Sequence, residues 1–447
     1  MAQAAARQLK LGAILEGVGA DPVSWRDPAL PGDASIDINW YIENARLAEA
    51  AKFDLVFIVD SPFITPDTAA HFLNRLEPLT LLSALAVSTS NIGLVGTLTT
   101  SYWEPYNVAR QFGSLDQISR GRAGWNVVTT GLEGASRNYG REEHFEHGHR
   151  YRRAREFVEV VQGLWDSYED DAFPRDKAAG VFLDKAKQHA LNHRGEFFSV
   201  AGPLALSRSR QGQPVIFQAG ISTEGRDLGA HIAEGVFAGV DGFEDGQEYY
   251  ADLKARAAAL GRNPDHISVL PPLSPIIAET DEEAQALAEA QRGEVPLDKL
   301  LVQLGRAFNY HDFRQYPIDG PFPDVSGLPL NAYKGHAERI VRISREQNLT
   351  LRRLAVQLRR RARNHRRRDR AVVHRPRGRR LHPARHPPAR LRPVPRTGGA
   401  DPATAGPVPH RIPTRHPARP PGPPGPRKPL EPSGAGGGGI ATACSLV

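Results

Sequence analysis

Histidine, arginine and tyrosine gather in one short segment of the chain that could bind an anion. The segment EEHFEHGHRYRRAREF contains His144, His147, His149, Arg150 and Tyr151. Three histidines in six positions also suggest a metal site, because imidazole is a common zinc ligand. No cysteine lies nearby and the H-E-x-x-H spacing is absent, so we expect no bound metal. Basic and hydroxyl side chains at the start of a helix indicate a phosphate instead.

A second segment with the chemistry of a phosphate site is GISTEGR, which contains Ser222 and Thr223. It follows an apolar run and opens a helical one. Backbone N–H groups at a helix start, together with the Ser222 hydroxyl, can hold a phosphate. The alternative is that Ser222 or Thr223 only caps the helix, a common role for these residue types.

Polar side chains also lie at or near the ends of three predicted strands. Asp60 ends DLVFIVD, Thr97 and Thr100 lie late in IGLVGTLTT, and Asn126 lies within GWNVVTT. Each could hydrogen-bond a ligand. Each also has a structural interpretation: Asp60 caps a loop, the threonines favour strands, and Asn126 is a buried amide with its own partners.

These segments belong to a chain in which predicted strands and helices alternate. The predicted strands are residues 11–16, 54–60, 92–100, 121–130, 214–220, 235–240 and 267–278. The predicted helices are residues 40–52, 77–89, 107–118, 150–168, 225–234, 247–260, 281–293 and 297–308. This alternation indicates a parallel sheet.

Two α/β folds have such a sheet, the doubly wound fold and the TIM (β/α)8 barrel. No G-x-G-x-x-G follows the first strand and no P-loop motif occurs, so we favour the barrel. In a barrel, function sits at the C-terminal ends of the strands. We expect one barrel domain over residues 1–358, with insertions at about 169–213 and 281–348.

A resemblance to a known family rests on three segments: GLVGTLTTSYWEPYNVARQFGSLDQISRGRAGWNVVTT, HGHRYRRAREFVEVVQGLWDSY and PVIFQAGISTEGRDLGAHIAEGVF. The chain resembles the bacterial-luciferase-like flavin monooxygenases, in the branch of the nitrilotriacetate and dibenzothiophene-sulfone monooxygenases. The resemblance covers about residues 11–357. It implies a TIM barrel that binds reduced FMN (FMNH2), supplied by a separate NAD(P)H:flavin oxidoreductase. It also implies that a C4a-(hydro)peroxyflavin, formed with O2, oxygenates a small organic substrate.

The resemblance also assigns the cofactor-binding residues. Asp60 and Thr97 or Thr100 would lie beside the flavin ring and ribityl chain. His147, Tyr151 and Ser222 would hold the ribityl and phosphate end, in agreement with the phosphate chemistry argued above. Asn126 is a further candidate at the barrel mouth, and no catalytic residue is assigned. Five aromatic residues could wall a substrate pocket or simply be core: Trp25, Phe63, Trp103, Phe217 and Phe243.

The C-terminal segment has a different composition from the rest of the chain. Residues 359–430 contain 20 Arg and one Lys against two acidic residues, whereas residues 1–358 carry 36 basic and 47 acidic residues. An Arg- and Pro-rich segment with few apolar side chains cannot offset the entropy of ordering, so we expect residues 359–447 to be disordered. The last barrel strand is then missing. We favour a frameshift near residue 358 as the origin of this tail, over a genuine basic arm that binds nucleic acid.

Composition excludes several other classes of protein. The single cysteine, Cys444, excludes an intrachain disulfide and a cysteine-rich metal centre. No apolar run reaches the roughly 18–20 residues of a membrane span, and no signal peptide is recognisable, so a cytoplasmic enzyme is expected.

Three functional hypotheses follow. The first is a two-component FMN-dependent monooxygenase, impaired by the altered C-terminus, and a homo-oligomer by resemblance. The second is a flavin- or phosphate-binding barrel without turnover, and the third is nucleic-acid association through the tail. Coenzyme F420 is the runner-up cofactor. The substrate is not predicted.

Overall fold

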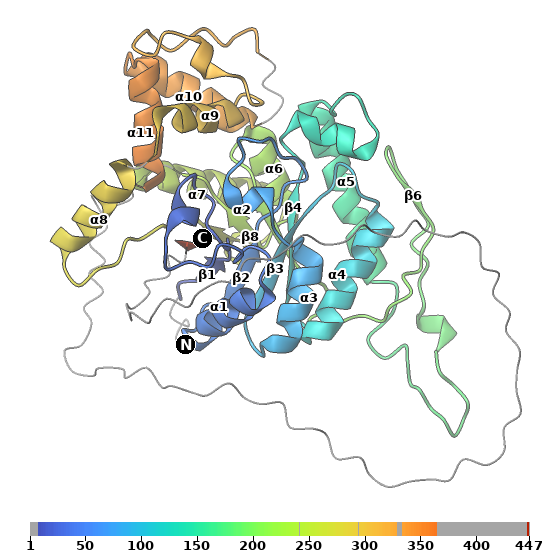
Figure 1. Ribbon diagram of the computed structural model, residues 1–447. Coiled ribbons are helices and arrows are strands. Elements are labelled where there is room, and N and C mark those ends of the chain that lie inside the picture. Colours follow the sequence, from blue (N-terminus) through green and yellow to red (C-terminus); the bar gives the residue numbers. More distant parts are fainter. Residues whose placement is uncertain (1–7, 241, 294, 329–332, 364–444, 447) are drawn as a thin grey trace, which may run out of the picture. The chain divides into compact units, whose positions relative to one another are not determined.

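The structure is a computed structural model that describes residues 8–240, 242–293, 295–328, 333–363 and 445–446. Its main element is a curled sheet with helices on the outer face (Figure 1). Seven parallel strands follow one another in the sheet in chain order: β1 (Gly12–Ile14), β2 (Leu55–Ile58), β3 (Gly93–Thr99), β4 (Ala123–Val128), β7 (Val215–Ala219), β8 (Gly235–Phe237) and β9 (Ser268–Leu270).

All seven strands predicted from the sequence are present, and each lies within its predicted range. The α/β class is therefore confirmed. The doubly wound alternative is wrong, because that fold reverses its strand order at a switch point, whereas here each new strand is added on the same side.

The edge of the sheet at β1 is covered by a two-residue strand, β10 (Ser445–Leu446), which runs antiparallel to β1. Among the described strands none pairs with β9 other than β8, so these strands form a partial barrel. Residues 364–444 and 447 lie outside the described residues, and with them most of the predicted tail. Helix α11 (Leu351–Arg363) continues past residue 358, where we placed the domain boundary.

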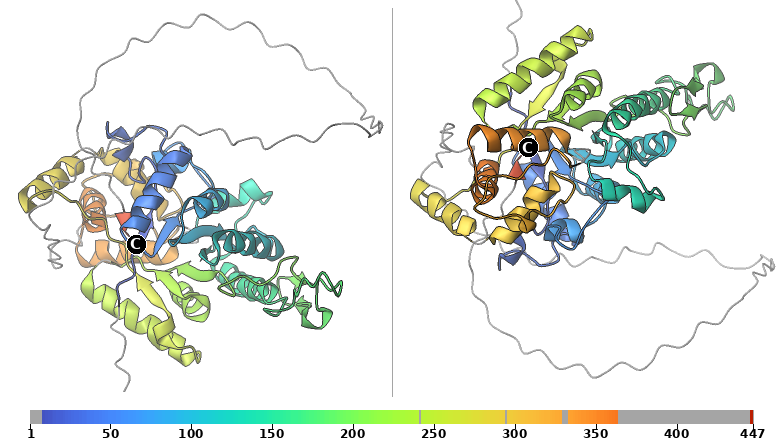
Figure 2. Two further views of the ribbon diagram at one scale, coloured as in Figure 1. Left: turned by 90° about the horizontal axis from the view of Figure 1, so that it is seen from below. Right: turned by 90° about the horizontal axis from the view of Figure 1, so that it is seen from above.

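Six helices cover the outer face of the sheet, each following a strand: α1 (Ile38–Ala50), α3 (Pro78–Ser88), α4 (Pro105–Ser119), α5 (His147–Trp165), α6 (Thr223–Ile232) and α7 (Phe243–Ala259). Neighbouring helices contact one another in chain order, as the views along the sheet show (Figure 2). Trp125 of β4 lies in the layer between sheet and helices, fully buried and 5.6 Å from the ring of Phe112. All six helices were predicted, with ends within a few residues.

Phenylalanine rings fill the concave side of the sheet. Phe237 stacks on Phe57 at 4.2 Å and on Phe217 at 5.2 Å between ring centroids. Val95 belongs to the same apolar cluster. Phe57 comes before Asp60 in the chain, and Val95 comes before Thr97. This apolar cluster, the phenylalanine floor, therefore lies beneath the predicted site residues at the C-terminal ends of the strands.

Two excursions leave the strand–helix alternation. The first, near residues 169–213, contains a small hairpin of β5 (His193–Arg194) and β6 (Ser199–Val200). Glu156 of α5 holds it, accepting from the backbone N–H groups of Phe197 and Phe198 at 2.9 Å each. The second contains α8 (Asp281–Gly293), α9 (Leu297–Arg306) and α10 (Lys334–Glu346), which fall within the predicted insertion at 281–348. With α11, α9 and α10 share an apolar core of their own.

Candidate functional site

Thr97 and Asn126 lie opposite each other on the adjacent strands β3 and β4. The Asn126 side-chain N–H donates to the Thr97 hydroxyl oxygen at 3.0 Å, and both side chains are almost fully buried. The Asn126 carbonyl oxygen Oδ1 has no hydrogen-bond partner among the described residues. Because a buried polar atom without a partner is costly, this oxygen is suited to accept from a ligand.

Asp60 follows β2 and pairs with Arg75 from the next loop. The Arg75 Nε and Nη2 groups donate to Asp60 Oδ1 at 3.1 and 2.5 Å, and Arg75 also donates to the Ser61 carbonyl oxygen at 2.9 Å. One carboxylate oxygen of Asp60 is therefore committed to the guanidinium at the mouth of the sheet.

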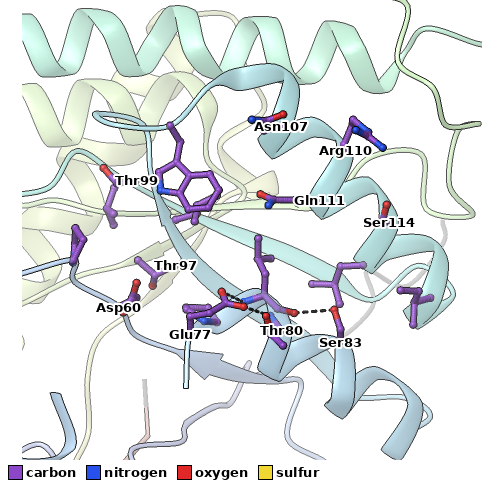
Figure 3. Close-up of a pocket in the computed structure, with 18 of the residues that line it drawn as sticks. Asp60, Glu77, Thr80, Ser83, Thr97, Thr99, Asn107, Arg110, Gln111 and Ser114 are labelled. Atoms are coloured by element: carbon purple, nitrogen blue, oxygen red, sulfur yellow. Dashed lines mark hydrogen bonds between the residues drawn. The ribbon is translucent and has the colours of Figure 1, made fainter. Parts of the chain in front are cut away.

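A cavity of about 780 Å³ begins at these strand ends. Asp60, Thr97, Thr99, Trp103 and Tyr139 line it at the sheet, and it continues along the groove between α3 and α4 (Figure 3). Its wall is mixed, with carboxylate, hydroxyl and aromatic groups. A cavity of this size and lining is typical of a small-molecule site.

Thr100, the alternative to Thr97, does not line this cavity. Its side chain is fully buried, and its hydroxyl donates to the Val128 carbonyl oxygen at 3.3 Å. Thr97 and Thr99, two residues apart on one face of β3, are the threonines that reach the cavity. Of the five predicted wall aromatics, Trp103 lines it and Phe217 belongs to the floor, whereas Trp25 and Phe243 are 52% and 61% exposed.

His147 and Tyr151 lie one turn apart at the start of α5, with their rings 4.8 Å apart. Glu146 begins this helix by accepting from the backbone N–H groups of Gly148 and His149 at 2.8 and 2.7 Å. His147 is buried, and burial followed by the charge of Arg150 lowers its pKa below the usual value. The imidazole is therefore neutral at pH 7, and its Nδ1 has no hydrogen-bond partner among the described residues.

Ser222 lies next to this histidine, at the start of α6. Its hydroxyl oxygen accepts from the Gly225 N–H at 3.1 Å, so Ser222 caps the helix as the second interpretation predicted. Glu224 in the first turn of α6 lies 3.6 Å from His147 Nδ1. The first turns of α5 and α6 therefore meet, which brings His147, Tyr151 and Ser222 to one place.

A second cavity, of about 340 Å³, opens beside Ser222. Thr223 and Arg226 of α6 line it together with Arg339 and Arg342 of α10. Helix N–H groups, hydroxyls and arginines are the groups that bind phosphate in proteins. The cap and phosphate interpretations of Ser222 are thus compatible, because a capping hydroxyl at a helix start also borders this cavity.

Two polar groups near the site, Tyr102 and Glu16, were missed by the sequence reasoning, whereas His144 was among the candidates for anion binding. The Nδ1 atom of His144 forms a hydrogen bond with the Tyr102 hydroxyl, and its Nε2 atom lies 2.9 Å from the Thr130 carbonyl oxygen. Burial, then Arg150, lowers the pKa of His144 to about 4, so it stays neutral. A carbonyl can only accept, hence the His144 Nε2–H faces Thr130 and the Tyr102 hydroxyl donates to Nδ1.

Glu16 lies two residues after the end of β1, and burial, then the charge of Asp21, raises its pKa to about 7. A carboxyl at the end of the apolar run LGAIL was a sequence signal for this group.

Among the described residues no three His, Cys, Asp or Glu side chains are placed to hold a metal ion. None of the helices in those residues has the length and apolar character needed to span a membrane.

The described site fits an FMN molecule in its chemistry. A flavin ring offers donors and acceptors along its edge, and the unpaired Asn126 Oδ1 beside Thr97 can accept from it. The phosphate end requires donors, which the Ser222 segment and its arginines provide. The two places lie on the same, C-terminal side of the sheet.

Comparison with known proteins agrees with this fit. The family model of the luciferase-like monooxygenases matches residues 23–402. The chain belongs to this family. Because its relatives are named monooxygenases, we identify it as an FMN-dependent monooxygenase.

Two relatives share close sequence similarity with this luciferase-like monooxygenase. It is 47% identical over 349 residues to N-acetyl-S-(2-succino)cysteine monooxygenase of Bacillus subtilis (strain 168), covering 78% of this chain and 79% of the relative. It is 43% identical over 361 residues to nitrilotriacetate monooxygenase component A of Aminobacter aminovorans, with the same coverage of 78% and 79%. A solved structure of riboflavin lyase with modified FMN and riboflavin is 32% identical, with a TM-score of 0.68 over 74% of this chain and 76% of that one.

Proposed function

We propose that this luciferase-like monooxygenase is the oxygenase component of a two-component system that uses FMNH2 from a separate NAD(P)H:flavin oxidoreductase. The observation that carries the proposal is the pairing of two half-sites on one side of the sheet. One half-site is the buried Thr97–Asn126 pair beside Asp60, and the other is the junction of α5 and α6. The name of the nitrilotriacetate relative, component A, supports a second component.

Reduced FMN, when bound, supplies the chemistry, because it reacts with O2 and gives one oxygen atom to the substrate. The residues of the chain bind and orient it. His147, Tyr151 and Ser222 would hold the ribityl and phosphate end, and Thr97, Asn126 and Asp60 would hold the ring. The phenylalanine floor excludes water from beneath the ring, which protects a reactive centre from side reactions.

The neutral state of the site histidines also fits this role. His144 and His147 both have lowered pKa values, so neither adds a charge at neutral pH. His147 can then donate or accept a hydrogen bond at Nδ1, depending on its tautomer. We also propose that the protein is a cytoplasmic homo-oligomer and that the described strands belong to a TIM barrel.

The test combines the purified full-length chain with FMN, NADH and a flavin reductase under 18O2. The candidate substrates are nitrilotriacetate, N-acetyl-S-(2-succino)cysteine and dibenzothiophene sulfone. We expect one 18O atom in an organic product, and less product from an Asn126→Leu variant. NADH oxidation that yields hydrogen peroxide alone, together with unchanged FMN affinity in that variant, contradicts the proposal.

A further inference from the structure

Two arginines lie beside one phenylalanine ring at the mouth of the sheet. The guanidinium carbon of Arg75 is 4.6 Å from the ring centroid of Phe72, and that of Arg306 is 5.4 Å from it. Phe72 belongs to the short helix α2 (Ala70–Leu73), and Arg306 ends α9 in the insertion. Segments more than 200 residues apart thus bring two positive charges to one ring.

The two charges are not equally compensated. Asp60 neutralises Arg75, but Arg75 Nη1 is buried and has no hydrogen-bond partner among the described residues. No carboxylate of the described residues lies within 4.0 Å of the Arg306 guanidinium. Arg306 instead faces aromatic groups, with Tyr333 5.8 Å away and in hydrogen-bonding contact. An arginine remains charged in a protein, so this place carries an uncompensated positive charge.

Two acidic groups that contact the insertion are engaged with other side chains. Glu133 accepts from the Asn309 side-chain N–H at 2.5 Å, and burial raises the pKa of Glu133 above its usual value. Asp67 pairs with Lys299 at 3.1 Å. These contacts fix the insertion over the loops that follow β2 and β4 without supplying a counter-ion to Arg306.

Arg306 is linked to the candidate flavin site by a chain of side-chain contacts. Arg75 connects the two, because it contacts Phe72 on one side and Asp60, which lines the larger cavity, on the other. The insertion reaches the same loops through Tyr310, whose ring is 5.8 Å from that of Phe63. A molecule held near Asp60 is therefore connected to Arg306 through the side chains of Arg75 and Phe72.

We infer that the substrate of this luciferase-like monooxygenase carries a carboxylate and that Arg306 is the residue that recognises it. The inference rests on the proposed function, whose site it extends. A guanidinium has five N–H donors, so the contact with Tyr333 leaves Arg306 donors for the two-point hydrogen bond that matches a carboxylate. Arg75 contacts the same Phe72 ring, and its Nη1 has no hydrogen-bond partner among the described residues.

The experiment measures binding of two probes to the full-length chain in the presence of oxidised FMN, in metal-free buffer. Nitrilotriacetate is the anionic probe and dibenzothiophene sulfone is the uncharged one. Arg306→Met removes the charge at similar length, and Arg306→Lys keeps the charge. Arg352→Met is the matched control, because Arg352 is an exposed arginine of α11, which shares an apolar core with α9, and it pairs with Asp319 at 2.7 Å.

We expect Arg306→Met to weaken nitrilotriacetate binding by about 10- to 100-fold, the usual effect of losing hydrogen bonds to a charged group. Arg306→Lys should retain more of the affinity, and Arg352→Met should retain all of it. FMN affinity should not change in any variant. Equal nitrilotriacetate binding by wild type and Arg306→Met overturns the inference, and so does a wild type that binds only the uncharged probe or neither probe.

Loss of both FMN and nitrilotriacetate in Arg306→Met would show that the residue acts on the fold, and would also overturn the inference. The proposed function is tested separately, because probe binding requires no turnover. Oxygenation that does not depend on Arg306 refutes this inference alone. Arg306-dependent binding of nitrilotriacetate without any 18O product refutes the proposed function alone.

Discussion

Because the side-chain carbonyl oxygen of Asn126 is buried without a partner among the described residues, we predict that removing it raises the stability of the flavin-free protein and lowers its affinity for FMN. The perturbation is the double variant Thr97→Val and Asn126→Leu, which replaces both hydrogen-bonding partners by apolar groups of nearly the same shape. A single Asn126→Leu change would leave the buried Thr97 hydroxyl without the donor that now lies at 3.0 Å. The double variant avoids that loss.

The magnitude follows from the contacts of the pair. A buried acceptor without a partner costs about 1–3 kcal/mol, and the Asn126–Thr97 hydrogen bond contributes about 1 kcal/mol net. Removing both groups should therefore stabilise the flavin-free protein by about 1 kcal/mol. The same change removes an acceptor for the flavin ring, so FMN affinity should fall about tenfold.

Two measurements check this prediction on the same preparations. Urea unfolding of the flavin-free chain gives the change in the free energy of unfolding, and titration of FMN fluorescence gives the affinity. Asn126→Leu alone is the control, with an expected loss of stability relative to the double variant. A double variant that is less stable than the wild type, or that binds FMN with unchanged affinity, would refute the reasoning.

Three further predictions concern the phosphate end, a buried acid and the C-terminus. Ser222→Ala should cost about 1 kcal/mol of stability by removing the cap of α6, and should weaken FMN but not riboflavin binding. Equal losses for both flavins would locate its effect in the fold instead. The raised pKa of Glu16 implies that it is protonated in the folded protein but ionised in the unfolded chain between pH 4.5 and about 7. The free energy of unfolding should therefore fall by up to roughly 3 kcal/mol as pH rises through this range, and Glu16→Gln should abolish the fall. Urea denaturation of both proteins from pH 4.5 to 8 measures this, and the same pH dependence of unfolding free energy in wild type and variant would contradict it. Sequencing of the gene across codons 340–447 should reveal another frame that encodes an acidic helix and an Asp-Gly-Phe-like strand, and the absence of such a frame would favour a genuine basic tail.

The strands were predictable because a parallel strand covered on both faces is a short apolar run. The helices α10 and α11 were missed. Their sequences are rich in arginine, and their apolar residues become a buried face only when the insertion packs on itself. The strand β10 was equally beyond reach, because a two-residue strand has no sequence pattern of its own.

The site was predicted as a set of residue types at strand and helix ends, but not in its pairing. The choice between Thr97 and Thr100 depends on which face of β3 each occupies, and a shift of one residue reverses the face. Arg75, Phe72 and Arg306 come together only through the fold, since more than 200 residues separate the last from the others. The contact of Tyr102 with His144 likewise joins two loops that the sequence does not connect.

The phenylalanine floor of Phe57, Phe217 and Phe237 limits how this enzyme could be redesigned for larger molecules. Each ring removed from such a packed layer would cost about 3–5 kcal/mol, a large share of the stability of a typical domain. Deepening the pocket is therefore expensive, whereas the loops after β2 and β4 and the insertion can be varied above it. Directed evolution for bulkier compounds should accumulate changes in those segments and leave the three rings intact.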